Sequence, residues 1–264
     1  MKRALKKYGQ HFLQPEWAEK LVAVITPHPD DRFLEIGPGP GALTLRLAPR
    51  VAHVTAVEID SAMIAALRAK LPSNVTLIHE DILEFDLRRL GPPPLRAAGN
   101  LPYNVASPIL FKLLHAHRDS HGIFQDATVM VQREVAERLE ARPGTKAYGV
   151  LAILVQLHAD VRRLLTLPAG AFRPAPKVES AVVRLGFRPP AVAVADETQF
   201  EQIVRSMFTQ RRKTLANALR PAGAVRNVDP AAALARAGID PRRRAETLEL
   251  TELARLVECF GSDA

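Results

Sequence analysis

Short apolar runs recur along the first half of the chain, and each is bounded by charged or turn-forming residues. Apolar runs of about four to six residues predict buried strands. The predicted strands are residues 32–36, 54–59, 75–79, 96–99 and 128–132. Between them, residues 42–47 begin one predicted helix, and a second runs to about residue 70 with Ser61 or the preceding Asp60 as its cap. Alternation of strand and helix is typical of a doubly wound, mostly parallel α/β sheet.

Two later apolar runs, 150–158 and 180–187, predict either two further strands or a strand and a helix. The pattern then changes. Residues 188–190, Arg-Pro-Pro, begin a segment typical of a linker, and the runs beyond it have helical rather than strand spacing. The predicted helices are residues 198–208, 213–219, 230–237 and 250–260. We therefore expect two domains, an α/β domain at residues 1–188 and a small all-helical domain at residues 189–264.

Composition narrows the class of protein. The chain has 264 residues, and no apolar run approaches the ~20 residues of a membrane span. The basic residues 1–7 are not followed by the apolar stretch of a secretory signal. The single Cys259 excludes an intrachain disulfide, and no Cys/His spacing suggests a zinc site, so we expect a protein of the reducing cytoplasm. A net charge of +8 favours contact with phosphate backbones or anionic membranes, although a basic solvated surface gives the same count.

A glycine-rich turn, Gly37-Pro38-Gly39-Pro40-Gly41, follows the first predicted strand and opens a helix. Glycines there allow close approach of a ligand, and a helix start adds partial positive charge. The turn therefore indicates a nucleotide-type site. Gly37, Gly39 and Ala42 also fit the relaxed dinucleotide pattern, so a nicotinamide cofactor and a purely structural turn both stay open on this motif alone.

Acidic and amide residues end the next three predicted strands. Glu58 ends the second strand and can accept hydrogen bonds from ribose hydroxyls. Asp81 follows the third strand and can accept from an adenine amino group, and Asn100 ends the fourth. Because the carboxyl ends of parallel strands meet at one edge, where such sheets bind ligands, these residues and the glycine turn predict a single site.

The segment Asn100-Leu101-Pro102-Tyr103 suits one difficult reaction, attack by the exocyclic amine of a nucleobase. That amine is a poor nucleophile because its lone pair is delocalised into the ring. The Asn100 side-chain oxygen and the Leu101 carbonyl beside Pro102 can accept its hydrogens and draw the nitrogen towards a tetrahedral shape. The Tyr103 ring offers a flat surface for the base. Since stacking in a duplex hides the amine, the target base must be flipped or unpaired.

Together these motifs resemble those of S-adenosylmethionine-dependent methyltransferases, specifically the small-subunit (16S) ribosomal RNA adenine N6,N6-dimethyltransferase family of dimethyladenosine transferases. The resemblance covers most of the chain. It is carried by residues 7–13, 35–41, 57–60, 81–83, 99–103, 132–138, 172–180 and 210–215. It implies a Rossmann-like class I methyltransferase fold with a seven-stranded sheet. Residues 1–188 would form the catalytic domain that binds S-adenosylmethionine, and residues 189–264 a helical domain that binds RNA or the ribosome.

The resemblance also implies roles for single residues. Those that border the cofactor S-adenosyl-L-methionine, or its product S-adenosyl-L-homocysteine, are Gln10, His11, Leu13, Gly37, Gly39, Glu58, Asp81 and Asn100. The implied catalytic set is Asn100, Leu101, Pro102, Tyr103 and Phe172. In that set Phe172 stacks on the base opposite Tyr103. The family often has Asn where this chain has His11, which keeps a contact with the cofactor but changes its detail.

By the same resemblance, two adjacent adenosines in the 3′-terminal hairpin of 16S rRNA, within the small (30S) subunit, each receive two methyl groups. A role in small-subunit biogenesis follows, for a cytoplasmic monomer with no metal and no membrane partner. The cluster Arg211-Arg212-Lys213 is expected to contact RNA phosphates, although such runs are often simply solvated.

Three other functions are weighed against this one. A 23S rRNA adenine N6-methyltransferase of the macrolide-resistance type shares the chemistry, but residues 172–180 and 210–215 favour the small-subunit family. A catalytically idle RNA-binding assembly factor is disfavoured by the intact Gly37, Glu58 and Asn100. A nicotinamide oxidoreductase is disfavoured because nothing downstream resembles a set of residues for hydride transfer.

Overall fold

The computed structural model describes residues 11–120 and 122–261, and it divides into two compact units. The first unit comprises residues up to 136 together with 160–188, and the second comprises 137–159 together with 189–264. The division after residue 188 is the one that the sequence suggests. Residues 137–159, expected in the α/β domain, group with the helical unit instead, because α6 (Val150–His158) packs with α7 (Glu197–Thr209).

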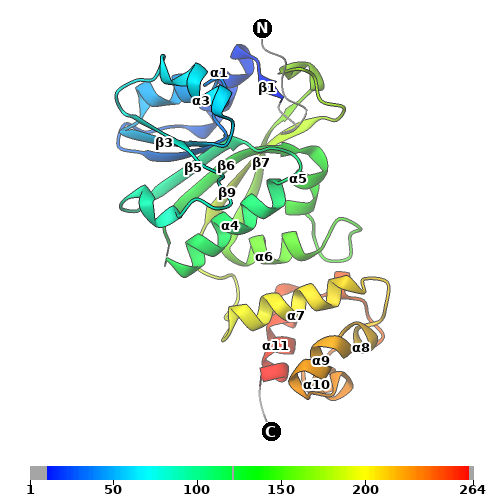
Figure 1. The fold of residues 1–264 in the computed structure, drawn as a ribbon. Coiled ribbons are helices and arrows are strands. Elements are labelled where there is room, and N and C mark those ends of the chain that lie inside the picture. Colours follow the sequence, from blue (N-terminus) through cyan, green and yellow to red (C-terminus); the bar gives the residue numbers. More distant parts are fainter. Residues whose placement is uncertain (1–10, 121, 262–264) are drawn as a thin grey trace. The chain divides into compact units, whose positions relative to one another are not determined.

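The first unit is built on a seven-stranded sheet, counted over the described residues (Figure 1). In spatial order its strands are β4 (Val75–His79), β3 (His53–Glu58), β2 (Arg32–Ile36), β5 (Leu95–Asn100), β6 (Phe124–Gln132), β9 (Ser180–Phe187) and β7 (Ala159–Leu167). The strands from β4 to β6 pair in parallel, and β9 pairs antiparallel to β6. The predicted doubly wound, mostly parallel α/β fold is thus confirmed.

The two later apolar runs prove to be different elements. Residues 180–187 form strand β9, whereas 150–158 form helix α6. Almost every residue of α6 is buried, so its sequence has no polar face from which a helical period could be read. The strand that follows it, β7, is not predicted by the apolar pattern. It is an edge strand with exposed Asp160, Arg162 and Arg163, and it therefore lacks a continuous apolar run.

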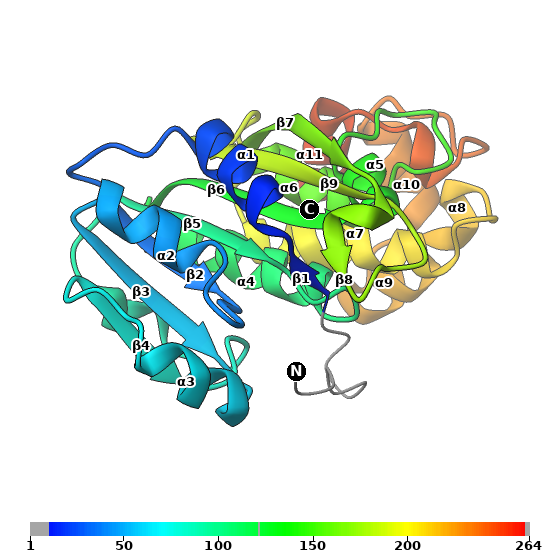
Figure 2. The same cartoon turned by 90° about the horizontal axis from the view of Figure 1, so that it is seen from above.

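Helices cover both faces of this sheet. In the described part of the first unit they are α1 (Pro15–Ile25), α2 (Thr44–Leu47), α3 (Ser61–Arg68), α4 (Ala106–Asp119) and the start of α5 (Arg133–Leu139). Figure 2 shows α1 and α2 on one face and α4 on the other. The buried face of α1, with Leu21 and Ile25, packs in one core cluster with Phe33, Met130 and Val182 of the sheet. That packing fixes α1 against this face of the sheet.

Two short strands tie distant parts of the first unit together. β1 (Phe12–Leu13) pairs antiparallel with β8 (Phe172–Arg173), so that Leu13 faces Phe172 across the pair. Just after β1, the Gln14 N–H donates to the carbonyl of Ala171 at 2.9 Å. These bonds fix the segment 11–14 beside the edge where the parallel strands end.

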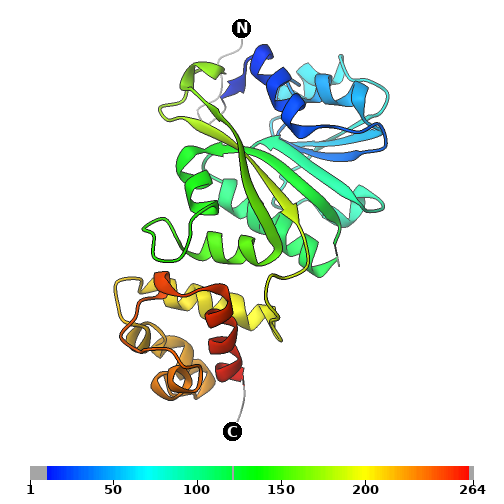
Figure 3. The ribbon, with the colours of Figure 1, turned by 180° about the vertical axis from the view of Figure 1, so that it is seen from behind.

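The second unit is helical among its described residues, as the sequence predicts (Figure 3). After α6 and α7 it contains α8 (Leu215–Ala218), α9 (Arg220–Arg226), α10 (Pro230–Arg236) and α11 (Leu250–Gly261). Its core includes Phe200 and Met207 of α7. The Tyr148 hydroxyl donates to the Leu248 carbonyl at 3.1 Å, which joins the segment before α6 to the turn before α11. The predicted helix at 213–219 begins as α8, and α9 was not predicted.

Candidate active site

A cavity of about 350 Å³ opens at the carboxyl ends of β2, β3, β4 and β5. Ten of the predicted site residues line it: His11, Leu13, Gly37, Gly39, Glu58, Asp81, Asn100, Leu101, Pro102 and Tyr103. Gln10 lies outside the described residues. The glycine turn and the ends of four strands therefore enclose one space, at the edge where doubly wound sheets bind ligands.

The glycine turn needs its glycines for backbone shape. Gly37 and Gly39 have φ values of +65° and +54°, in the left-handed region that glycine enters without strain. A Cβ at Gly99 on the neighbouring strand would lie 2.5 Å from the Ile36 carbonyl oxygen, so that position has no room for a side chain. The following helix, α2, begins at Thr44 and has only four residues, so the expected contribution of a helix start to ligand binding is small.

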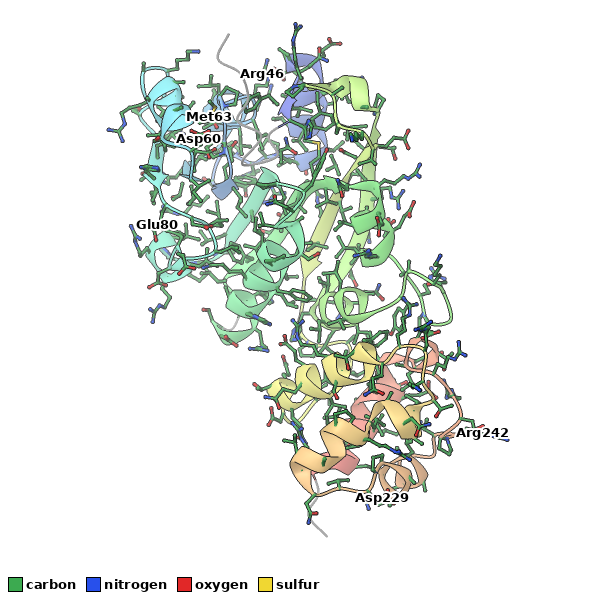
Figure 4. The ribbon with its side chains drawn as sticks, turned by 45° about the vertical axis from the view of Figure 1, so that its right-hand side comes forward. Arg46, Asp60, Met63, Glu80, Asp229 and Arg242 are labelled. Carbon is green, nitrogen blue, oxygen red and sulfur yellow. The ribbon has the colours of Figure 1, made fainter. Side chains whose placement is uncertain are left out.

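Glu58 is held rigidly at the end of β3. Its Oε2 accepts from the Gly39 N–H and its Oε1 from the Asp60 N–H, both at 2.9 Å. The side chain is 5% exposed, and burial raises the pKa of its carboxyl. Each carboxylate oxygen has a second lone pair, so the anchored group can still accept from a ligand hydroxyl. Asp60, labelled in Figure 4, caps α3 by accepting from Ala62 N–H at 2.8 Å.

Asp81 lies on the same edge, after β4. Its Oδ1 accepts from the Leu83 N–H at 2.9 Å, which stabilises the turn that closes this side of the cavity. The neighbouring Glu80, also labelled in Figure 4, is paired with Arg89 at 2.8 Å. Asp81 is therefore the carboxylate of this turn that can reach an amino group in the cavity.

The Asn100 carboxamide is oriented by a hydrogen bond to the segment before β1. Its Nδ2 donates to the main-chain carbonyl of His11 at 2.8 Å. Because a carbonyl oxygen can only accept, the nitrogen must face His11, and Oδ1 is the atom that can accept from a ligand. The Leu101 N–H donates to the Met130 carbonyl at 3.0 Å, which ties this segment to β6. The result is an acceptor oxygen with a fixed direction at the cavity wall.

Tyr103 is held at both its hydroxyl and its ring. The hydroxyl shares a hydrogen bond of 2.7 Å with the buried Ser180 Oγ, and burial raises the pKa of the phenol. The ring stacks on the His11 imidazole, with 5.4 Å between the ring centroids and 26° between the planes. Tyr103 is therefore a neutral, restrained aromatic surface on the cavity.

Phe172 is the one described site prediction that the structure does not bring into the cavity. Its side chain is 3% exposed and belongs to the core cluster with Met130 and Val182. The ring supports β1 through its partner Leu13. A ring buried in this way has no face open for a base, and the sequence offers no signal that separates an aromatic core residue from a stacking one.

Sequence reasoning missed Glu35, a carboxyl in the wall of the cavity. It is 1% exposed, and among the described residues its Oε2 has no hydrogen-bond partner. Burial raises its pKa to about 7; interactions with Thr44 oppose that rise, and the charge of Glu58 adds to it. The available signal was a charged residue inside an otherwise apolar strand. An unpartnered buried carboxylate oxygen on a cavity fits a cationic group of a ligand, which S-adenosylmethionine would bring as its ammonium or sulfonium.

Arg211 has an internal role in the second unit. Its guanidinium donates to the carbonyls of Thr145 and Lys146, the latter at 2.6 Å, and pairs with Glu246 at 3.5 Å. It braces the segment before α6 against the segment before α11. The two basic residues that follow it in the sequence are exposed.

Comparison with known sequences identifies the family to which the chain belongs. The sequence model described as ribosomal RNA adenine dimethylase matches residues 1–261. The chain belongs to this adenine dimethylase family. Within it, Ribosomal RNA small subunit methyltransferase A of Geobacter metallireducens is 45% identical over 265 residues, covering 96% of this chain and 94% of the relative. The protein of the same name from Anaeromyxobacter sp. is 44% identical, covering 98% of this chain and 94% of the relative.

Solved structures agree with the assignment to the adenine dimethylase family. A dimethyladenosine transferase from Plasmodium falciparum superposes with a TM-score of 0.76 at 25% identity, covering 93% of this chain and 96% of that one. The 23S rRNA methyltransferase ErmE superposes with a TM-score of 0.66 at 27% identity, covering 95% of this chain and 100% of that one.

Among the described residues, no helix has the length and apolar character needed to cross a bilayer. No group of three metal-ligating side chains occurs among those residues either.

Proposed function

We propose that this protein transfers methyl groups from S-adenosyl-L-methionine to N6 of two adjacent adenosines near the 3′ end of 16S rRNA in the small (30S) ribosomal subunit. Each adenosine becomes N6,N6-dimethylated, and S-adenosyl-L-homocysteine is the product. The observation that carries the proposal is the Asn100 carboxamide, whose acceptor oxygen is directed by the His11 carbonyl at the wall of the cavity. Family membership and the identity of 45% to a small-subunit methyltransferase support it.

The part of the cavity lined by the glycine turn, Glu58 and Asp81 has a partner for each part of the methyl donor S-adenosylmethionine. Glu58, anchored by two backbone N–H groups, accepts from the ribose hydroxyls. Asp81 accepts from the adenine amine of the cofactor, and Gly37 and Gly39 let the backbone approach closely. Glu35 faces the cationic part of the ligand with its unpartnered oxygen. When bound, S-adenosylmethionine supplies a methyl group made electrophilic by the sulfonium.

The part of the cavity formed by residues 100–103 acts on the amine of the target adenine. Asn100 Oδ1 and the Leu101 carbonyl accept its two hydrogens, which frees the nitrogen lone pair and stabilises the positive charge that develops on it. Pro102 limits the backbone freedom of the segment, and the restrained Tyr103 ring stacks on the base. Fixed acceptors and a fixed stacking surface hold the amine in line with the methyl donor, so positioning provides much of the rate.

RNA contact is assigned to exposed cations of the helical unit. Three segments of that unit are joined by hydrogen bonds, from Gly144 N–H to the Glu246 carbonyl at 2.7 Å and from Leu215 N–H to the Arg243 carbonyl at 2.8 Å. The exposed basic residues on these segments are Arg142, Lys146, Arg212, Lys213 and Arg244. Arg242, labelled in Figure 4 at the surface, is paired with Asp240. Several exposed cations on segments that hydrogen bonds hold together suit a phosphate backbone.

The test uses small subunits that lack the modification. They are incubated with the protein and methyl-labelled donor, and nuclease fragments of the 16S rRNA are analysed by mass spectrometry. Two neighbouring N6,N6-dimethyladenosines near the 3′ end are expected. Labelling of 23S rRNA instead would favour the activity named for ErmE. No labelling of either RNA would favour an idle assembly factor. Sedimentation of the purified protein tests the proposed monomer, and co-fractionation with cytoplasmic small subunits tests its location.

A further inference from the structure

His11 touches both groups that are assigned to the target base. Its main-chain carbonyl accepts from Asn100 Nδ2 at 2.8 Å. Its imidazole stacks on the Tyr103 ring, with the centroids 5.4 Å apart. Its Nδ1 lies 2.8 Å from the carbonyl oxygen of Pro174. Because that oxygen can only accept, Nδ1 carries the proton and donates. One side chain thus links the segment that begins at Asn100 to the segment after β8.

The spacing of the two rings decides what the imidazole can do. A base inserted between two rings needs ~3.5 Å on each side, so the centroids would have to be roughly 7 Å apart. The observed 5.4 Å leaves no such room. The imidazole therefore covers one face of Tyr103 and leaves the other face, or the outer face of the imidazole, for a base. Phe172 does not stack on Tyr103 or on a base here, because its side chain is 3% exposed and lies in the core.

Three aromatic rings line the cavity among the described residues, those of His11, Phe12 and Tyr103. Phe12 lies against the glycine turn, with its ring carbon 3.3 Å from the position of a Cβ at Gly39. His11 is thus the ring that contacts Tyr103. With the hydroxyl of Tyr103 held by Ser180 and one face of its ring covered by His11, the ring is restrained at two points.

We propose that His11 is a positioning residue for the target adenine: its imidazole, anchored at Pro174, backs the Tyr103 ring so that the two form one stacking platform. This inference rests on the proposed function. Preorganising the platform in the free protein removes the entropy loss of ordering the Tyr103 ring when the base enters. The effect of the platform therefore belongs to the step in which bound RNA places its adenine, whereas a contact of His11 with the cofactor is measured separately as cofactor affinity.

Two substitutions separate the ring of His11 from its hydrogen bond. His11→Phe keeps an aromatic ring and loses the bond to Pro174, whereas His11→Asn keeps a donor and loses the ring. His11→Ala loses both. Since an aromatic pair contributes ~0.5–1.5 kcal/mol, the single-turnover methylation rate should fall about 2- to 12-fold in His11→Ala and His11→Asn. In His11→Phe it should stay within about twofold of the wild type. The rates are compared at saturating donor, and the dissociation constant of S-adenosylhomocysteine is measured for all three variants, so that a change in cofactor affinity does not enter the comparison.

A readout without RNA tests the platform itself. The chain has 3 tyrosines, so 3-fluorotyrosine labelling gives a simple fluorine spectrum, in which Tyr103→Phe assigns the resonance of interest. That resonance should move in His11→Ala and His11→Asn, and remain closer to its original position in His11→Phe. His28→Ala is the matched control, because His28 is an exposed histidine whose side chain is 71% accessible. It should alter neither the rate nor the spectrum.

Three outcomes would overturn the inference. They are a His11→Phe rate as slow as that of His11→Ala, a His11→Asn rate equal to the wild type, and a slower rate that disappears at saturating donor. If His11→Ala does not fold, the contrast between His11→Phe and His11→Asn still decides. A wild-type protein that methylates no small subunits refutes the proposed function instead, and the fluorine spectra tell the two failures apart.

Discussion

Replacing Glu35 with Gln should stabilise the free protein at alkaline pH. The carboxyl is buried in the cavity wall, and burial raises its pKa to about 7 from its ordinary value of 4.5. A group whose pKa is raised on folding binds more protons in the folded state than in the unfolded state. Stability is therefore lost as pH rises from ~4.5 to ~7, and above that range the loss is complete. At 1.36 kcal/mol per pKa unit, the full loss is about 3 kcal/mol.

Glu35→Gln removes this titration while keeping nearly the same shape. At pH 8 the variant should unfold at a temperature several degrees above the wild type, since ~1 kcal/mol corresponds to roughly 2–4 °C for a domain of this size. At pH 5 the two proteins should unfold at similar temperatures. Thermal unfolding followed by circular dichroism between pH 5 and 8 measures the difference. Glu84→Gln, at an exposed carboxylate, is the control and should leave the difference from wild type independent of pH.

The same residue should couple cofactor binding to proton release. A cationic ligand favours the ionised carboxylate, so binding of S-adenosylhomocysteine at pH 7 should release about half a proton from Glu35. Calorimetry in two buffers of different ionisation enthalpy counts these protons, and Glu35→Gln should lose the release together with part of the affinity. The reasoning is refuted if the pH dependence of stability is the same in wild type and variant, or if Glu35→Gln binds the ligand more tightly at pH 8.

Further predictions concern the base and the RNA. Asn100→Ala should lower the rate of methyl transfer by roughly 10²–10³, as expected for loss of one aligned polar group, while S-adenosylhomocysteine still binds; full activity would contradict the assigned role. Tyr103→Ala should slow single-turnover transfer by about 5- to 150-fold, from ~1–3 kcal/mol of stacking, and Tyr103→Phe should recover most of the rate; equal losses in the two variants would point to the hydroxyl instead. Arg212→Ala combined with Lys213→Ala should reduce the slope of log affinity for small subunits against log salt by about 2, and an unchanged slope would remove both residues from the interface.

The sequence was most informative where a chemical group follows a buried strand. Glu58, Asp81 and Asn100 each end a strand of the parallel sheet, and their approach around one cavity follows from the geometry of parallel pairing alone. Strands β2, β3 and β5 were predictable because nearly all their residues are buried, which leaves short and largely apolar runs in the sequence.

Sequence reasoning was weakest where tertiary packing decides the role of a residue. Phe172 stands in a motif-like segment, yet it belongs to the core. Arg211 opens a basic run, yet its charge is used within the fold, whereas its two neighbours are exposed. Glu35 is the opposite case: it lies inside a strand and was not expected in the site, yet it lines the cavity. Helix α6 and strand β7 show the same limit for elements, because α6 is buried along almost its whole length and β7 carries exposed charges, so neither has a clear periodic pattern.

The short pairing of β1 with β8 joins residues that are separated by some 160 positions in the chain. During synthesis, the segment that carries His11 emerges early, but its strand partner, and the Pro174 carbonyl that holds its side chain, come only after most of the sheet has been made. A nascent chain that stops before residue 172 has the glycine turn and the Asn100 segment but cannot assemble this wall of the pocket. Ligand capture is thus deferred until the α/β unit is almost complete.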